Sequence, residues 1–160
     1  MSTAASSPFR IASIALDDAM GPRSREIEEE RKVAIYDLLA GNHFRPRGSP
    51  GGPYHVKLGI AENRLVFDIR LADDSEHGRC LLSLTPFHRL VKDYIGLCQS
   101  YYAAIREAPP GRIEAIDMGR RGLHDDGSNL LRERLEGKIE LDFETARRLF
   151  TLICALHLKA

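Results

Sequence analysis

The period of the hydrophobic pattern changes at Thr85-Pro86, and this change constrains the fold more than any other feature. Four earlier segments show the alternation or short apolar runs of strands bounded by turn residues. They are residues 9–16, 54–60, 64–71 and 79–84. Beyond Pro86, apolar residues recur at helical spacing. Strands grouped early and helices grouped late predict an α+β fold, in which a small antiparallel sheet of three to four strands packs against a helical C-terminal half.

Helical spacing and capping residues predict five helices. They are residues 24–41, 85–106, 112–121, 126–136 and 142–158. Thr85 is expected to cap the second helix, with Pro86 at its first position, and Asp142 to cap the last. The helices at 85–106 and 142–158 are expected to pack on one face of the sheet. Residues 45–53, which hold three prolines and three glycines, are expected to form a loop.

Composition limits the domain count and the classes of partner. The chain has 160 residues, which predicts a disordered tail over 1–8 and a single α+β domain over 9–160. Its 23 basic and 23 acidic residues give zero net charge, so nucleic acid is not expected as a partner. No apolar run reaches membrane-spanning length, and the N-terminus lacks the pattern of a signal peptide.

The three cysteines indicate a reducing compartment. Cys80, Cys98 and Cys154 form no paired motif, and their neighbours are largely apolar. An odd number of cysteines in apolar surroundings is typical of buried free thiols. Together with the missing signal peptide and membrane span, this pattern predicts a cytoplasmic protein.

Six segments carry a resemblance to a known family. They are EEERKVAIYDLL (28–39), GGPY (51–54), LSLTPFHRLVKDY (82–94), SYYAAI (100–105), IEAIDMGRRGLHDDGS (113–128) and DFETARRLFTLICALH (142–157). Together they resemble uncharacterised protein family 0262, a family of small cytosolic proteins of alphaproteobacteria. The resemblance covers nearly the whole chain. It implies no activity, cofactor, partner or site residue.

The stretch AIDMGRRGLHDDGS (115–128) is the strongest candidate for a binding site. If one helix ends near Gly122 and Asp125 or Asp126 begins another, the new helix N-terminus and nearby arginines favour an anion. The anion-binding candidates are Arg120, Arg121, His124, Ser128, Arg147 and Arg148. The alternative is a helix junction in which these arginines pair with acids. The candidates for such a charged network are Asp117, Glu114, Arg89 and Asp93.

No complete catalytic or metal-binding motif is present. His124-Asp125 resembles half of the metal site of His-Asp phosphohydrolases, but no HxH or HxxxH spacing accompanies it. Ser128 lies outside any GxSxG elbow. We therefore predict no metal and no cofactor.

Two functional hypotheses follow, and the sequence leaves open whether the protein is an enzyme. The first is a non-enzymatic binding or regulatory protein that docks on a protein partner or forms a homo-oligomer such as a homodimer. The second is an enzyme or sensor that binds a phosphorylated small molecule or nucleotide near the Arg120-Arg121 pair. A thermal-shift screen of phosphorylated ligands discriminates between the two hypotheses.

Overall fold

A computed structural model describes residues 7–17, 25–73 and 75–157, and its main sheet has the strand order β1-β3-β4-β5. These strands are β1 (Ile11–Asp17), β3 (Tyr54–Ala61), β4 (Arg64–Leu71) and β5 (Glu76–Ser83). They confirm the four predicted strand segments and the α+β class. One detail of the prediction is wrong, because β1 pairs parallel to β3 while the other pairs are antiparallel. The sheet is therefore mixed.

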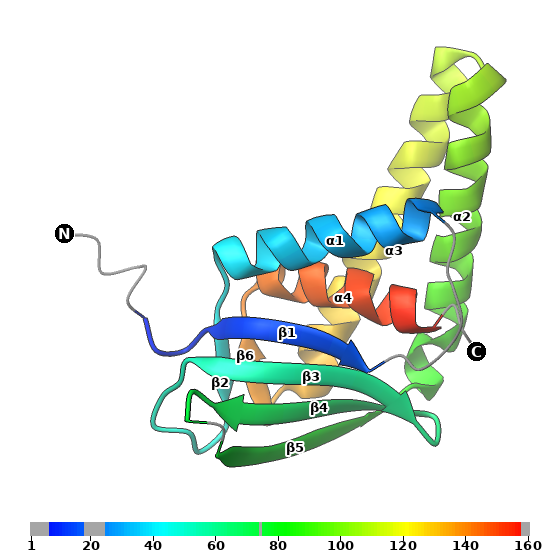
Figure 1. The fold of residues 1–160 in the computed structure, drawn as a ribbon. Helices are drawn as coiled ribbons and strands as arrows, with labels where there is room; N and C mark the ends of the chain where they lie inside the picture. The colour runs from blue at the N-terminus through cyan, green and yellow to red at the C-terminus, as the bar shows by residue number, and fades with distance from the viewer. Residues whose placement is uncertain (1–6, 18–24, 74, 158–160) are drawn as a thin grey trace.

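Helices cover one face of this sheet (Figure 1). They are α1 (Arg25–Ala40), α2 (His88–Glu107), α3 (Pro110–Leu135) and α4 (Phe143–His157). α1 and α4 pack together above the strands, while α2 and α3 pair with each other and extend away from the sheet as a hairpin. The expectation that residues 85–106 lie along the sheet beside α4 is therefore wrong. α1 takes that place, and the fully buried core residues of α2 lie in the segment from Val91 to Cys98.

The third and fourth predicted helices are one continuous helix, α3. Gly119 and Gly122 lie in its interior, and Asp125 and Asp126 are exposed positions on it. The predicted helix N-terminus at Asp125 or Asp126 is therefore wrong, and no run of free backbone N–H groups exists there. An interior glycine costs only about 1 kcal/mol relative to alanine, so packing along a long helix can offset it.

Close packing of α3 on α4 fixes the part of α3 that carries the candidate residues. A Cβ atom added to Gly127 would lie 2.2 Å from Cζ of Phe150. The ring of Phe150 is fully buried and contacts the rings of Tyr94 and His124. Glycine at position 127 thus lets the two helices approach closely and sets the spacing between their polar side chains.

A second, two-stranded sheet was not predicted. It joins β2 (Phe44–Pro46) to β6 (Ile139–Leu141) in antiparallel pairing, and we call it the β2–β6 ribbon. β2 occupies the start of the predicted loop. Strands of three residues, one of them ending in proline, are too short to show a periodic pattern.

Cap residues follow the predictions in part. Asp142 Oδ1 accepts a hydrogen bond from Thr145 N at 2.9 Å, which confirms the cap of α4. Thr85 instead begins a short 3-10 helix, Thr85–Phe87, and its Oγ1 accepts a hydrogen bond from Asn63 Nδ2 at 3.0 Å, so the predicted cap by Thr85 is wrong.

Of the predicted tail, residues 1–6 lie outside the described ranges, and Pro8 O accepts a bond from Gly52 N. Across residues 7–17, 25–73 and 75–157, every helix is too short or too polar to cross a lipid bilayer.

Candidate functional site

Four arginines line one cavity of about 470 Å³ at the junction of α3 and α4, and we call it the arginine cavity. Its described lining residues are Tyr94, Arg120, Arg121, His124, Asp125, Phe143, Arg147, Arg148 and Thr151. Five of the six anion-binding candidates from the sequence therefore meet in one place. Asp125 is the single carboxylate among these lining residues, while the acids that pair with the four arginines lie outside the lining.

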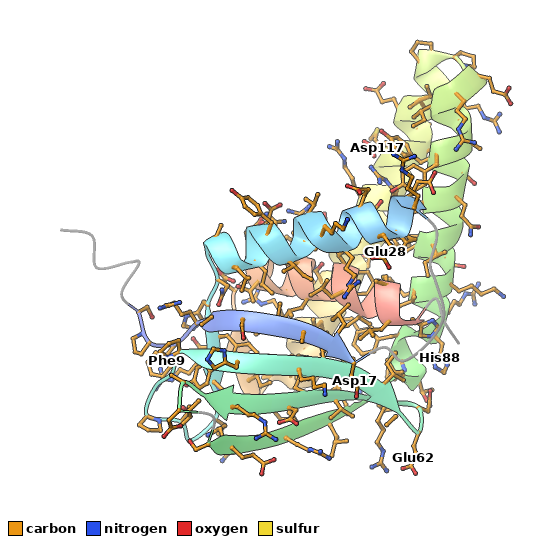
Figure 2. The ribbon with its side chains drawn as sticks, in the orientation of Figure 1. Phe9, Asp17, Glu28, Glu62, His88 and Asp117 are labelled. Carbon is orange, nitrogen blue, oxygen red and sulfur yellow. The ribbon has the colours of Figure 1, made fainter. Side chains whose placement is uncertain are left out.

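Asp117 pairs with both arginines of the Arg-Arg run. Its Oδ1 accepts hydrogen bonds from Arg120 Nη2 at 2.6 Å and from Arg120 Nε at 3.2 Å, and its Oδ2 lies 3.0 Å from Arg121 Nε. Figure 2 shows Asp117 on the part of the hairpin that stands beside α1. The predicted pairing with Asp117 is confirmed, yet within the described residues Arg121 uses only its Nε, which leaves both terminal nitrogens as donors.

Arg120 connects three helices. Its Nη1 lies 3.8 Å from Glu30 Oε2 of α1, and its guanidinium stacks 4.2 Å from the ring centroid of Tyr101 on α2. The hydroxyl of Tyr102 donates to the Glu30 carboxylate. Burial raises the pKa of Glu30, and the positive charge of Arg120 opposes that rise. Glu30 of α1 thus holds the α2–α3 hairpin through its contacts with Arg120 and Tyr102. The sequence analysis did not select Glu30.

The two arginines of α4 keep much of their bonding capacity. Glu144 Oε1 accepts a hydrogen bond from Arg147 Nη1 at 3.2 Å and lies 3.5 Å from Arg148 Nη1. Arg148 Nε is also 3.9 Å from Asp37 Oδ2. Arg147 Nε is buried and has no hydrogen-bond partner among the described residues. A buried donor without a partner is costly, and this nitrogen keeps its full capacity to donate.

His124 is a buried imidazole at the inner wall of the cavity. Its Nε2 lies 2.8 Å from Thr151 Oγ1, and its Nδ1 has no hydrogen-bond partner among the described residues. Burial lowers the pKa of His124 to about 4, and the charges of Arg147, Arg120 and Arg148 add to this effect. The ring is therefore neutral at physiological pH, which leaves one nitrogen as donor and the other as acceptor.

Tyr94 adds a neutral hydroxyl to the wall. Its side chain is largely buried against the rings of His124 and Phe150. Burial, followed by the nearby Cys98 thiol, holds the pKa of the phenol well above its usual value. Sequence reasoning interpreted Tyr94 as a core residue. Thr151 was detectable as one of two polar residues in the apolar run 149–158, because a polar residue there needs a buried partner.

The remaining sequence candidates do not line the arginine cavity. Ser128 is fully buried and donates to His124 O at 2.7 Å, so it stabilises the helix and faces no ligand. Arg89 and Asp93 form an exposed pair at 3.8 Å near the sheet end of α2, close in sequence to His88, which Figure 2 labels. Glu114 is exposed on the hairpin. These placements exclude them from the cavity.

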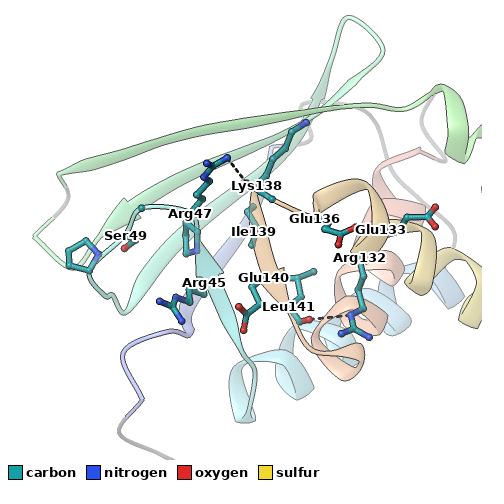
Figure 3. A pocket seen from close by; sticks show the side chains of 14 residues that line it. Arg45, Arg47, Ser49, Arg132, Glu133, Glu136, Lys138, Ile139, Glu140 and Leu141 are labelled. Carbon is teal, nitrogen blue, oxygen red and sulfur yellow. Dashed lines mark hydrogen bonds between the residues drawn. The ribbon is translucent and has the colours of Figure 1, made fainter.

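A larger cavity, about 940 Å³, lies elsewhere, beside the β2–β6 ribbon (Figure 3). Its cations are largely engaged by the chain itself. Arg45 stacks 4.7 Å from the ring centroid of Phe9, and Arg132 Nε donates to Leu141 O at 3.2 Å. Three glutamates also line it, against three arginines and one lysine. Within the described residues, no group of three or more His, Cys, Asp or Glu residues can hold a metal ion.

Comparisons with known proteins agree over nearly the whole chain. A family model described as "Uncharacterised protein family (UPF0262)" matches residues 8–159. A UPF0262 protein of Caulobacter vibrioides (strain NA1000 / CB15N) is 58% identical over 158 residues, 98% of each chain. A UPF0262 protein of Maricaulis maris is 59% identical over 152 residues, 94% of this chain and 95% of the relative. No solved structure matches. The names of these relatives state no ligand, so the site is judged by its geometry.

Proposed function

The chain belongs to the uncharacterised protein family UPF0262, and from the geometry of the arginine cavity we propose that it is a binding protein for a small phosphorylated molecule. The observation that carries this proposal is the convergence of four guanidinium groups on a cavity with one lining carboxylate. A planar guanidinium group can donate two parallel hydrogen bonds to two phosphoryl oxygens. Several guanidinium groups in one cavity favour a ligand with more than one negative charge.

The acids around the cavity orient the arginines and offset part of their charge, while the guanidinium nitrogens outside these pairs stay available as donors. Asp117 holds Arg120 and Arg121 from the side of α3, and Glu144 holds Arg147 from α4. Neither carboxylate lines the cavity. Pairs of this kind restrict side-chain rotation, so less conformational entropy is lost when a ligand binds.

The other wall residues favour a ligand that needs neutral hydrogen-bonding groups beside its charge. His124 and Tyr94 offer a ring nitrogen and a hydroxyl, while the hydroxyl of Thr151 is already bonded to His124 Nε2 and to Arg147 O. A volume of about 470 Å³ has room for a phosphoryl group together with the rest of a metabolite of modest size. The three unpaired cysteines favour a reducing compartment such as the cytoplasm, where phosphorylated metabolites are abundant.

Melting-temperature and calorimetric titrations with inorganic phosphate and pyrophosphate, at constant ionic strength, test the proposal. We expect saturable stabilisation of the wild-type protein by at least one of these probes. Arg121→Gln and Arg147→Gln are each expected to weaken the binding about tenfold, because each loses one charge-assisted contact. Arg121 is largely exposed, so its replacement should leave the fold intact.

Arg89→Gln is the matched control. It removes the same charge from an exposed arginine outside the cavity and is expected to change the affinity less than about twofold. The proposal fails if neither probe binds. It also fails if Arg89→Gln weakens binding as much as the cavity variants do, because the attraction would then be a general effect of net charge.

A further inference from the structure

A second surface lies along the free edge of β5 and is independent of the arginine cavity. β5 is the last strand of the main sheet, with β4 on one side and no strand paired to its other side among the described residues. A hollow of about 350 Å³ follows this edge and is lined by five consecutive residues, His77 to Leu81. Because successive strand residues point to opposite faces, a hollow lined by five in a row extends along the strand.

The opposite wall of this hollow is the β2–β6 ribbon. It contributes Pro46 and Arg47 from one segment and Lys138 and Ile139 from the other. Arg47 N donates to Lys138 O at 2.8 Å, which extends the ribbon's pairing beside the hollow. Figure 3 shows the side chains of Arg47 and Lys138 extending next to each other from the ribbon. The hollow is therefore a trough between β5 and the β2–β6 ribbon.

The charge of the trough has one sign. Arg47, Arg79 and Lys138 line it together with His77, and no aspartate or glutamate is among its described lining residues. Ile69 and Ile139 are buried at its floor, and Leu81 is about half exposed beside it. A cationic rim above an apolar floor complements a strand that alternates acidic and apolar side chains.

The edge of β5 is regular over the part of the trough from Arg79 to Leu81 and irregular at its start. The register of β4 and β5 shifts once, between Ile69 and Arg70, next to His77 and Gly78 at the start of β5. From Arg79 to Ser83 the pairing with β4 is continuous. A regular, unpaired edge presents backbone N–H and C=O groups at strand spacing, which is the surface that an added strand needs.

We infer that the trough is a docking site for an extended acidic peptide segment of a partner protein, which adds to the sheet as a strand beside β5. Nucleic acid fits the trough less well. No phenylalanine, tyrosine or tryptophan is among its described lining residues to stack on a base, and the chain has zero net charge. The inference does not depend on the proposed function.

Fluorescence anisotropy with a short labelled peptide that alternates glutamate and valine tests the inference. We expect saturable binding to the wild-type protein. Arg79→Glu and Lys138→Glu are each expected to weaken it about tenfold or more, since each reverses a charge at the rim. Arg64→Glu is the control, because it makes the same charge change at an exposed position of β4 outside the trough.

Two further probes separate strand addition from simple charge attraction. A peptide of the same sequence with N-methyl groups on alternate residues loses backbone donors, and it is expected to bind about tenfold more weakly. Single-stranded RNA of equal charge is expected to bind more weakly than the peptide. Equal binding by the methylated peptide, tighter binding by RNA, or no saturable binding of the peptide would each overturn the inference.

Discussion

At the scale of single residues, His124 connects the packed core to the arginine cavity. Its ring contacts the rings of Tyr94 and Phe150, and its Nε2 is bonded to Thr151. Burial and three nearby arginines hold its pKa at about 4. Protonation would place a further positive charge in a wall that already holds four arginines, so the folded state favours the neutral ring.

This lowered pKa makes a pH-dependent contribution to stability. The folded-state pKa of about 4 lies below the ordinary 6.5, so the unfolded chain binds the proton more readily, and stability is lost as pH falls from 6.5 towards 4. We expect a loss of about 2 kcal/mol from this residue between neutral pH and about pH 4.5.

Urea unfolding of the wild type and His124→Gln at several pH values measures this loss. The raised pKa of Glu30 instead increases the free energy of unfolding as the pH falls. This contribution is present in both proteins and cancels in the difference between them. The difference in free energy of unfolding between wild type and variant should narrow by about 2 kcal/mol between neutral pH and about pH 4.5. A gap that stays constant with pH would contradict the account of His124.

At the scale of elements, the continuity of α3 determines where the arginines lie. The sequence predicted a break at Gly122 because glycine weakens helices, but α3 runs through Gly119, Gly122 and Gly127. Contacts with α2 and α4 along its length offset that local cost. The continuous helix places Arg120, Arg121 and His124 on the wall of the arginine cavity and removes the helix N-terminus that the sequence had suggested as an anion site.

Two glycine substitutions in α3 should have opposite effects. At Gly122 an added Cβ would meet no atom within 4 Å, so Gly122→Ala is expected to raise the free energy of unfolding by about 0.5–1 kcal/mol. At Gly127 the same atom would clash with Phe150, so Gly127→Ala is expected to lower it by about 2–3 kcal/mol. Denaturant unfolding of both variants measures this contrast, and equal effects would show that α3 does not pack on α4 as described.

At the scale of the whole molecule, local sequence patterns predicted most helices and strands. The pairing of strands depends on contacts between distant segments, which local patterns do not show. Alternation identified β3, β4 and β5, and helical spacing identified α1, α2 and α4. The parallel pairing of β1 with β3 and the β2–β6 ribbon join segments far apart in the chain, which no local period reveals. The expectation of a protein partner or homo-oligomer stays a prediction.

The candidate site was predictable in its residue types but not in its shape. The Arg-Arg run and the arginines of α4 were selected from sequence because their charges lie on predicted helices. Their meeting in one cavity depends on how α3 crosses α4, which the contact of Gly127 with Phe150 sets. Glu30 of α1 was missed for the same reason, since only the folded hairpin brings Arg120 near it.

We propose that an anion binds beside His124, between α3 and α4. Nuclear magnetic resonance of the His124 ring during a phosphate titration tests this binding most directly. A bound phosphate stabilises the imidazolium, so we predict that saturating phosphate raises the pKa of His124 from about 4. The rise should be lost in Arg147→Gln and kept in Arg89→Gln. An unchanged pKa at saturating phosphate, or an equal rise in both variants, would contradict the claim.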